Sequence, residues 1–293
     1  MTAQTLDRPE DIASRSAVAG TTSSAHRHLG LLVAIGTVVS AALYLHGAGW
    51  WYAPLALVLA HGLLLIAVLF VTSRFAVGKA EGTAAAPGSV VIRRPRLYDR
   101  IVGLVTLGRE GRVRSRVLEL AEITPGSEVL DVGCGTGTLL LAAAERVRPS
   151  GELHGIDPAP EMIAHARAKA AAQGAELRLR EGSADVLPYP DASFDVVLCT
   201  MVMHHLPETL RQRAVEEMTR VLRPGGRVVI VDLQRPRGLK AIFSLVALLH
   251  GLRTASGLLP GAHAALENAG LTELRYAPVG VAALGAVVGR RRS

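Results

Sequence analysis

The distribution of hydrophobic positions divides the chain into two parts with different periodicities. Residues 29–45 and 53–71 are apolar runs without a charged side chain. Each run approaches the ~20 residues that a membrane-spanning helix needs. From residue 97 onward, short apolar runs alternate with segments in which apolar residues recur every three or four positions. This second pattern is typical of a parallel sheet covered by helices on both faces.

The short apolar runs predict the strands of this sheet, and the periodic segments predict its helices. Strands are expected at residues 128–132, 152–156, 176–180, 194–199, 227–231, 272–276 and 281–288. Helices are expected at residues 112–121, 138–147, 160–173, 208–222 and 263–269. Because helices and strands alternate, the fold class predicted for this part of the chain is α/β.

The predicted organisation has four parts. They are a disordered tail at residues 1–28, a transmembrane helical hairpin at 29–72, a linker at 73–96 and a globular domain at 97–293. Basic residues flank the hairpin on both sides, so the positive-inside rule predicts a two-helix, multi-pass protein of the cell membrane. Its termini and its globular domain are then cytoplasmic. A buried soluble hairpin is the alternative, although charge-free helices are unusual outside membranes.

Charge and cysteine content restrict the partners of the protein. The net charge is +7, which suits either nucleic acid or an anionic membrane surface. The membrane is favoured, and no nucleic-acid partner is expected, because the basic residues flank the apolar runs and no nucleic-acid-binding motif is present. The two cysteines, Cys134 and Cys199, match no metal-binding spacing, so no metal site is predicted.

The stretch VLDVGCGTGTL, residues 129–139, joins a predicted strand to a predicted helix. Its glycines Gly133, Gly135 and Gly137 let backbone N–H groups approach a ligand at a helix N-terminus. Asp157 ends the next strand, where a carboxylate can accept hydrogen bonds from both hydroxyls of a ribose. Loop and acid together predict a cofactor that contains a nucleoside, whereas the loop alone is equally compatible with a plain tight turn.

Four segments in this order resemble class I S-adenosylmethionine-dependent methyltransferases. They are VLDVGCGTG, GIDPAPEMI, GSADVLPYPDASFDVVLCTMVMHHL and EMTRVLRPGGRVVIVDL, and the resemblance covers about residues 98–232. It implies S-adenosylmethionine as the cofactor. It also implies a Rossmann-like, doubly wound, mostly parallel seven-stranded sheet, here preceded by the two-helix transmembrane hairpin.

The resemblance also implies roles for individual residues. The glycine loop and Asp131 would hold the methionine part of the cofactor, and Asp157 its ribose. Either Ser183 or Asp185 would reach the adenine amino group. The full set of implied cofactor residues is Asp131, Gly133, Cys134, Gly135, Gly137, Asp157, Pro158, Met162, Ser183, Ala184, Asp185 and Thr200.

Candidate catalytic and substrate residues follow the fourth strand and precede the first helix. His204 and His205 are candidates for a general base or for orienting the acceptor, with loop packing as the alternative role. Met201 is expected beside the sulfonium. Residues 97–120 resemble quinone-biosynthesis and phospholipid N-methyltransferases, which implies that Tyr98, with Asp99, lies over the cofactor as a substrate contact.

The membrane hairpin predicts a hydrophobic small-molecule or lipid-like acceptor, such as a quinone, reached through membrane attachment at residues 29–72. The alternatives are a methyltransferase for a soluble metabolite and a regulatory protein that binds the cofactor without turnover. The loop spacing disfavours an NAD-linked oxidoreductase. Residues 239–252 form a further apolar segment, for which a membrane-facing lid helix and ordinary core packing are both open.

Overall fold

A computed structural model of the protein describes residues 77–78, 82–106, 108–234, 252–281 and 283–293. All of them belong to one compact unit, Ser73–Ser293. The predicted tail and hairpin at residues 1–72, and nearly all of segment 239–252, lie outside the described residues. Among the helices that are described, none combines the length and the apolar composition that a membrane crossing requires.

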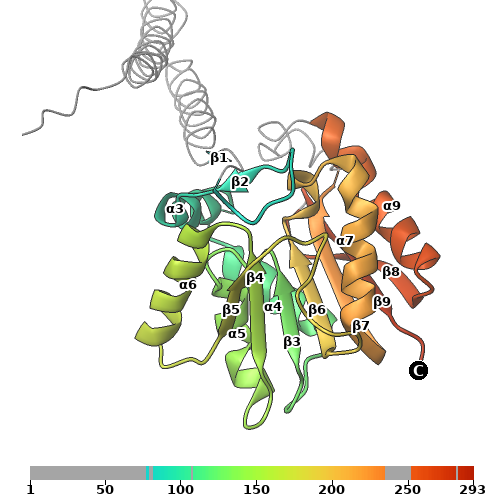
Figure 1. The fold of residues 1–293 in the computed structure, drawn as a ribbon, viewed down its shortest axis with the longest axis horizontal. Helices are drawn as coiled ribbons and strands as arrows, with labels where there is room; N and C mark the ends of the chain where they lie inside the picture. The colour runs from blue at the N-terminus through green and yellow to red at the C-terminus, as the bar shows by residue number, and fades with distance from the viewer. Residues whose placement is uncertain (1–76, 79–81, 107, 235–251, 282) are drawn as a thin grey trace, which may run out of the picture. The chain divides into compact units, whose positions relative to one another are not determined.

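The described residues form a seven-stranded sheet with the order β5-β4-β3-β6-β7-β9-β8 (Figure 1). Its strands are β3 (Val129–Val132), β4 (Leu153–Asp157), β5 (Arg178–Glu181), β6 (Phe194–Thr200), β7 (Leu222–Leu233), β8 (Thr272–Pro278) and β9 (Leu284–Arg290). The first five strands in the sheet order are parallel, and β9 runs antiparallel to both of its neighbours. The predicted mostly parallel, seven-stranded α/β fold is confirmed.

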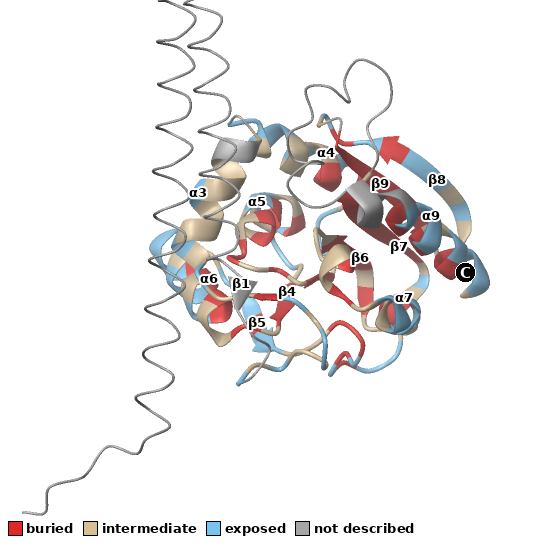
Figure 2. Ribbon diagram, turned by 90° about the horizontal axis from the view of Figure 1, so that it is seen from above, coloured by how far each residue is buried: buried red, intermediate tan, exposed pale blue. Residues whose placement is uncertain are grey.

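The helices cover both faces of this sheet. They are α3 (Pro95–Val105), α4 (Glu110–Ala121), α5 (Thr138–Val147), α6 (Pro160–Ala172), α7 (Glu208–Val221) and α9 (Leu252–Asn268), with the 3₁₀ turn η1 at Met203–His205. Helices α4 and α5 pack together on one face, and α7 and α9 on the other. Figure 2 shows the buried residues concentrated in the strands between these layers. Strands buried on both faces read as continuous apolar runs, which explains why the sequence revealed them.

The chain reverses its direction of winding at β3. From β3 it proceeds outward through β4 to β5, and it then returns to β6 on the other side of β3 and continues to β7. Ligands of doubly wound sheets bind in the crevice at such a switch point, outside the carboxyl ends of the strands. The residues that follow β3, β4 and β6 are therefore the candidates for a site.

Two predicted elements differ from the structure at the C-terminal side of the domain. Strand β7 begins at Leu222, with a register shift opposite Phe194–Val196 that accommodates the RPGG sequence expected as a turn. The helix expected at residues 263–269 is α9, which begins at Leu252 and contains Pro260. Proline inside a helix removes a backbone hydrogen bond, so the sequence pattern favoured a later start than the structure shows.

The predicted linker at residues 73–96 is wrong for its second half, which belongs to the domain. Val77–Gly78 (β1) pairs antiparallel with Val91–Ile92 (β2), and α3 already starts at Pro95. Val91 is only 2% exposed and packs against Ala159 and Met162. We call residues 82–94 the strap, because this small-residue, proline- and arginine-containing segment is held against the domain despite its linker-like composition.

Candidate functional site

The glycine loop leaves β3 at the switch point with a backbone that only glycine adopts readily. Gly133 and Gly135 have φ values of +73° and +53°. A Cβ on Gly133 would lie 2.2 Å from Cγ2 of Val202, which follows β6, so the two strand ends meet there. A Cβ on Gly135 would meet no described atom within 4 Å. The loop thus closes against β6 at Gly133 and faces open space at Gly135.

Asp157 ties the end of β4 to this loop. Its Oδ2 accepts a hydrogen bond from the Gly135 N–H at 3.0 Å, and its Oδ1 accepts one from the Ala159 N–H at 2.9 Å. A carboxylate has about four acceptor positions, so two remain for a diol. Burial raises the pKa of Asp157 to about 6, although both N–H donors act in the opposite direction. The position and the remaining acceptor capacity match the implied role with ribose.

Asp131 is the second acid of the crevice and is 1% exposed. Its Oδ1 has no hydrogen-bond partner within the described part of the chain. Burial and then the neighbouring charge of Asp157 raise its pKa to about 8. A buried oxygen without a partner is destabilising, and a cationic ligand group would relieve that penalty. S-adenosylmethionine carries an ammonium and a sulfonium, so Asp131 fits the positively charged part of that cofactor.

Tyr98 on α3 lies close to both acids. Burial, followed by the charges of Asp157, Asp99 and Asp131, raises its pKa to about 12. The structure therefore brings Tyr98 to the cofactor crevice, where the resemblance implied it.

A polar cluster of Asp99, Thr136, Thr138 and Lys169 fastens α3 to the glycine loop. The Thr136 hydroxyl donates to Oδ1 of Asp99 at 2.7 Å. The Lys169 ammonium on α6 donates to the Thr138 hydroxyl at 2.6 Å and to Oδ2 of Asp99 at 3.2 Å. We name these four residues the α3 latch. Sequence reasoning missed Thr136, Thr138 and Lys169, because no motif or periodicity links α6 to α3.

The adenine-side residues form a connected group. The Ser183 hydroxyl hydrogen-bonds to Oδ1 of Asp185, and Asp185 is itself buried. The two residues between which the sequence left the choice open therefore act as one polar unit. Met162 is buried beneath the strap, next to Val91 and Ala159.

Cys134 of the glycine loop belongs to the hydrophobic core. Its side chain is buried in the core, and a Cβ on Gly155 of β4 would lie 2.8 Å from its Sγ. Burial raises the pKa of the thiol well above its usual value, so the thiolate is disfavoured. Its backbone N–H donates to the carbonyl of Ile156, which fixes the loop. Cys134 thus contributes packing and loop geometry through atoms that face the sheet.

The segment after β6 carries the candidate catalytic residues. Thr200 ends the strand, and Met201 has a φ of +60°, which is a strained conformation for a side chain of its size. Nδ1 of His204 lies 2.8 Å from Oδ1 of Asp232, a fully buried residue near the end of β7. The rings of His204 and His205 are 4.0 Å apart between centroids.

Sequence reasoning missed Asp232, although the signal was present. Like Asp157, Asp232 is an acid at the carboxyl end of a buried apolar strand. Its significance depends on β7 lying next to β6, which the sequence did not establish.

The strap crosses the crevice above these groups, and Figure 1 shows it running over the carboxyl ends of the strands. The Ala84 N–H donates to the carbonyl of Pro158 at 3.1 Å, on the ribose side. The Val90 N–H donates to the carbonyl of His205 at 2.9 Å, on the histidine side. Both ends of the crevice are therefore bonded to one short segment that runs over the strand ends.

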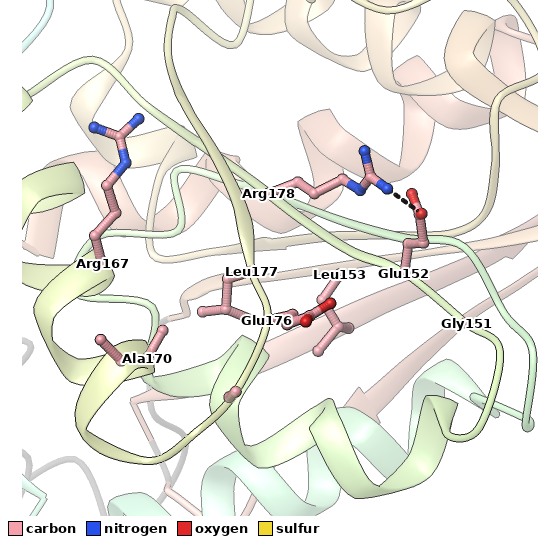
Figure 3. Close-up of a pocket in the computed structure, with 10 residues that line it drawn as sticks. Gly151, Glu152, Leu153, Arg167, Ala170, Glu176, Leu177 and Arg178 are labelled. Carbon is pink, nitrogen blue, oxygen red and sulfur yellow. Dashed lines mark hydrogen bonds and ion pairs between the residues drawn. The ribbon is translucent and has the colours of Figure 1, made fainter.

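A separate cavity of about 420 Å³ lies at the opposite end of the strands (Figure 3). Its lining residues are Gly151, Glu152, Leu153, Arg167, Ala170, Ala171, Ala175, Glu176, Leu177 and Arg178. Arg178 pairs there with Glu152. None of these residues belongs to the glycine loop or to the other strand ends of the crevice, so this cavity is not the cofactor site.

Glu128, Glu152 and His154 bring three donor atoms within 4.8 Å of one another beside that cavity. Nε2 of His154 lies 3.2 Å from Oε2 of Glu152, and its ring packs edge-on against Tyr189. Because Arg178 also pairs with Glu152, the charges of the group are already partly balanced. We assign these residues a structural role.

Comparison with known proteins agrees with this geometry. Residues 129–226 match the family described as "Methyltransferase domain". This part of the chain, about a third of its length, is similar to methyltransferase domains. A methyltransferase domain agrees with the two acids and the glycine loop described above.

The proteins similar to this chain include two curated relatives. A demethylmenaquinone methyltransferase of Thermus thermophilus is 39% identical over 149 residues, which is 51% of this chain and 66% of that protein. One of Bacillus cytotoxicus is 33% identical over 151 residues, 50% of this chain and 63% of that protein. The chain thus spans less than two thirds of the length of either relative.

A solved structure of an S-adenosylmethionine-dependent methyltransferase from Aquifex aeolicus supports the fold. It has a TM-score of 0.52 and 23% identity, and the match covers 66% of this chain and 97% of that one. At this identity the likeness concerns the fold alone.

Proposed function

We propose that the protein transfers the methyl group of S-adenosylmethionine to a hydrophobic quinol, the reduced form of demethylmenaquinone or of a close analogue. The observation that carries this proposal is the 39% identity over 149 residues with a demethylmenaquinone methyltransferase. The strap supports it, because a segment bonded across the strand ends would shield a hydrophobic acceptor from water.

Different residues of the chain bind different parts of the cofactor. Asp157 holds the ribose hydroxyls, and Asp131 provides the negative charge for the cationic end of the cofactor. When bound, the cofactor supplies an activated methyl group on a positively charged sulfur. The protein aligns the acceptor with that methyl and keeps water out, and Tyr98 and the strap contribute to both tasks.

Membrane attachment through residues 29–72 is the second part of the proposal. Two charge-free apolar runs with basic flanks support it, with the catalytic domain and both termini on the cytoplasmic side. A quinol dissolved in the bilayer is then available at a high effective concentration.

The activity is tested with the full chain in detergent or lipid nanodiscs, methyl-labelled S-adenosylmethionine and chemically reduced demethylmenaquinone. We expect label in the organic phase, and none with Gly135→Asp, which places bulk and negative charge in the loop. Label that appears only in water-soluble products of a cell extract would replace the quinol with a soluble acceptor. Cofactor binding without transfer to either fraction would indicate a regulatory protein.

The attachment is tested by fractionating cells that produce the full chain or a variant lacking residues 29–72. We expect the full chain to stay with the membranes after washes with high salt and alkaline carbonate, and the shortened chain to be released. Recovery of the full chain in the soluble fraction without detergent contradicts the attachment.

A further inference from the structure

Asp232 holds both the ring and the backbone of His204. Its Oδ1 lies 2.8 Å from Nδ1 of the ring, and its Oδ2 accepts a hydrogen bond from the His204 N–H at 3.3 Å. The Leu233 N–H also donates to Oδ1, at 2.7 Å. The carboxylate therefore acts as an acceptor toward this segment, and two contacts to one residue fix the ring orientation.

This arrangement determines which ring nitrogen carries the proton. Because the carboxylate accepts, the neutral imidazole has its proton on Nδ1 and its lone pair on Nε2. The Asp232 side chain is 1% exposed and that of His204 is 8% exposed, so water weakens the pair little. A positive charge formed on the ring would be balanced by the adjacent carboxylate.

The pair lies at the edge of the sheet that holds the cofactor crevice. Val202, two residues before His204, packs against Gly133 of the glycine loop. In the strand register, Asp131 on β3 stands opposite Leu198 on β6, so the acid and the segment after Thr200 extend toward the same edge.

We propose that His204 is the base that takes the proton of the acceptor hydroxyl during methyl transfer, and that Asp232 is its positioning residue. This inference rests on the proposed function for the nature of the acceptor. The acceptor O–H proton passes to Nε2, and the ring carbon of the quinol bonds to the methyl carbon. The S–CH3 bond breaks with its electron pair staying on sulfur, which becomes neutral. The ring carbon then loses its hydrogen as a proton to water, and the imidazolium returns its proton to the oxygen.

The decisive variant is Asp232→Asn in the full chain, assayed with methyl-labelled S-adenosylmethionine and reduced demethylmenaquinone. An amide can turn its NH₂ toward Nδ1 and reverse the tautomer, so we expect kcat to fall by about 10²-fold or more. The KM for the cofactor should change little. Asp232→Glu should restore part of kcat, and His204→Gln should lower kcat at least as far as Asp232→Asn does.

If Asp232 only held the segment after β6 in place, its substitution would affect stability more than catalysis. If Asp232→Asn lowers the melting temperature but leaves kcat within about threefold, the inference is wrong.

Nitrogen NMR of the histidine rings gives a readout that needs no acceptor. We expect His204 to carry its proton on Nδ1 in the wild-type chain and to lose that preference in Asp232→Asn. A wild-type ring protonated on Nε2 overturns the positioning role. A wild-type chain that fails to methylate the quinol while His204 shows the expected tautomer contradicts the proposed acceptor instead.

Discussion

Asp131 and Asp157 are buried at neighbouring strand ends, and no described basic side chain is hydrogen-bonded to either. Their raised pKa values, about 8 and about 6, mean that the folded protein without cofactor disfavours their charged forms. These two buried acids therefore lower the free energy of unfolding of the cofactor-free protein. They lie where a cationic ligand would be bound most favourably. Such a conflict between local stability and chemistry is typical of binding sites.

The substitution Asp131→Asn should separate the cost of Asp131 to stability from its contribution to cofactor binding. The pKa of Asp131 is about 8 in the folded state against an ordinary value of 3.8. The folded state thus retains a proton that the unfolded state releases, so this group lowers the free energy of unfolding as the pH rises from about 4 to 8. Because asparagine does not titrate, the stability of the variant relative to wild type should increase between pH 5 and pH 8.

Thermal unfolding of the cofactor-free chains in detergent at several pH values measures this difference. The same variant should bind S-adenosylmethionine at least tenfold more weakly, by analogy with the loss of a charged hydrogen-bond partner. A stability difference that is constant across the pH range would contradict the raised pKa of Asp131.

At the scale of elements, the parallel strands and most helices were predictable from the sequence. Strands buried on both faces are continuous apolar runs, and helices buried on one face repeat apolar residues every three or four positions. Strand β3 is fully buried, and α5 was predicted with the bounds that the structure shows. The strap was mistaken for a linker because its only deeply buried apolar residue is Val91. Its position depends on backbone hydrogen bonds and on packing against α6, neither of which has a sequence signature.

The site was predictable to the same extent. Acids at strand ends, such as Asp157, can be found because parallel strands end at one edge of the sheet. The side-chain direction of Cys134 and the pairing of His204 with Asp232 require knowledge of which strands are neighbours.

The α3 latch provides a test at this scale. Lys169→Met removes the donor that joins Thr138 to Asp99, while the hydrophobic part of the side chain remains. We expect hydrogen exchange in residues 95–105 to accelerate and the affinity for S-adenosylmethionine to fall by roughly tenfold, or about 1.4 kcal/mol. Arg116→Met is the matched control, because Arg116 pairs with the exposed Glu119 on its own helix, α4. Equal effects of the two substitutions would show that the latch does not hold α3.

For the molecule as a whole, the strap shows that the functional unit begins before the first methyltransferase motif. A chain that starts at residue 97 keeps the glycine loop, both acids and the histidines, but it loses the hydrogen bonds to Pro158 and His205. A chain that starts at residue 82 keeps them.

Comparison of these two shortened chains tests the strap. We expect the longer one to bind S-adenosylmethionine with the affinity of the full chain, and the shorter one to bind it more weakly and to expose the crevice to water. Isothermal titration of both, with circular dichroism to verify folding, measures the difference. Equal affinities would mean that the strap covers the crevice without contributing to the bound state.

The strap joins the ribose side of the crevice to the histidine side by one hydrogen bond at each end. Under the proposed function, the strap lies over both the cofactor site and the acceptor site. Opening the strap for one ligand therefore also exposes the site of the other. This geometry favours an ordered catalytic cycle in which both products leave during one opening. Product inhibition patterns should then show an ordered mechanism. That order would follow from the strap and not from any single active-site residue.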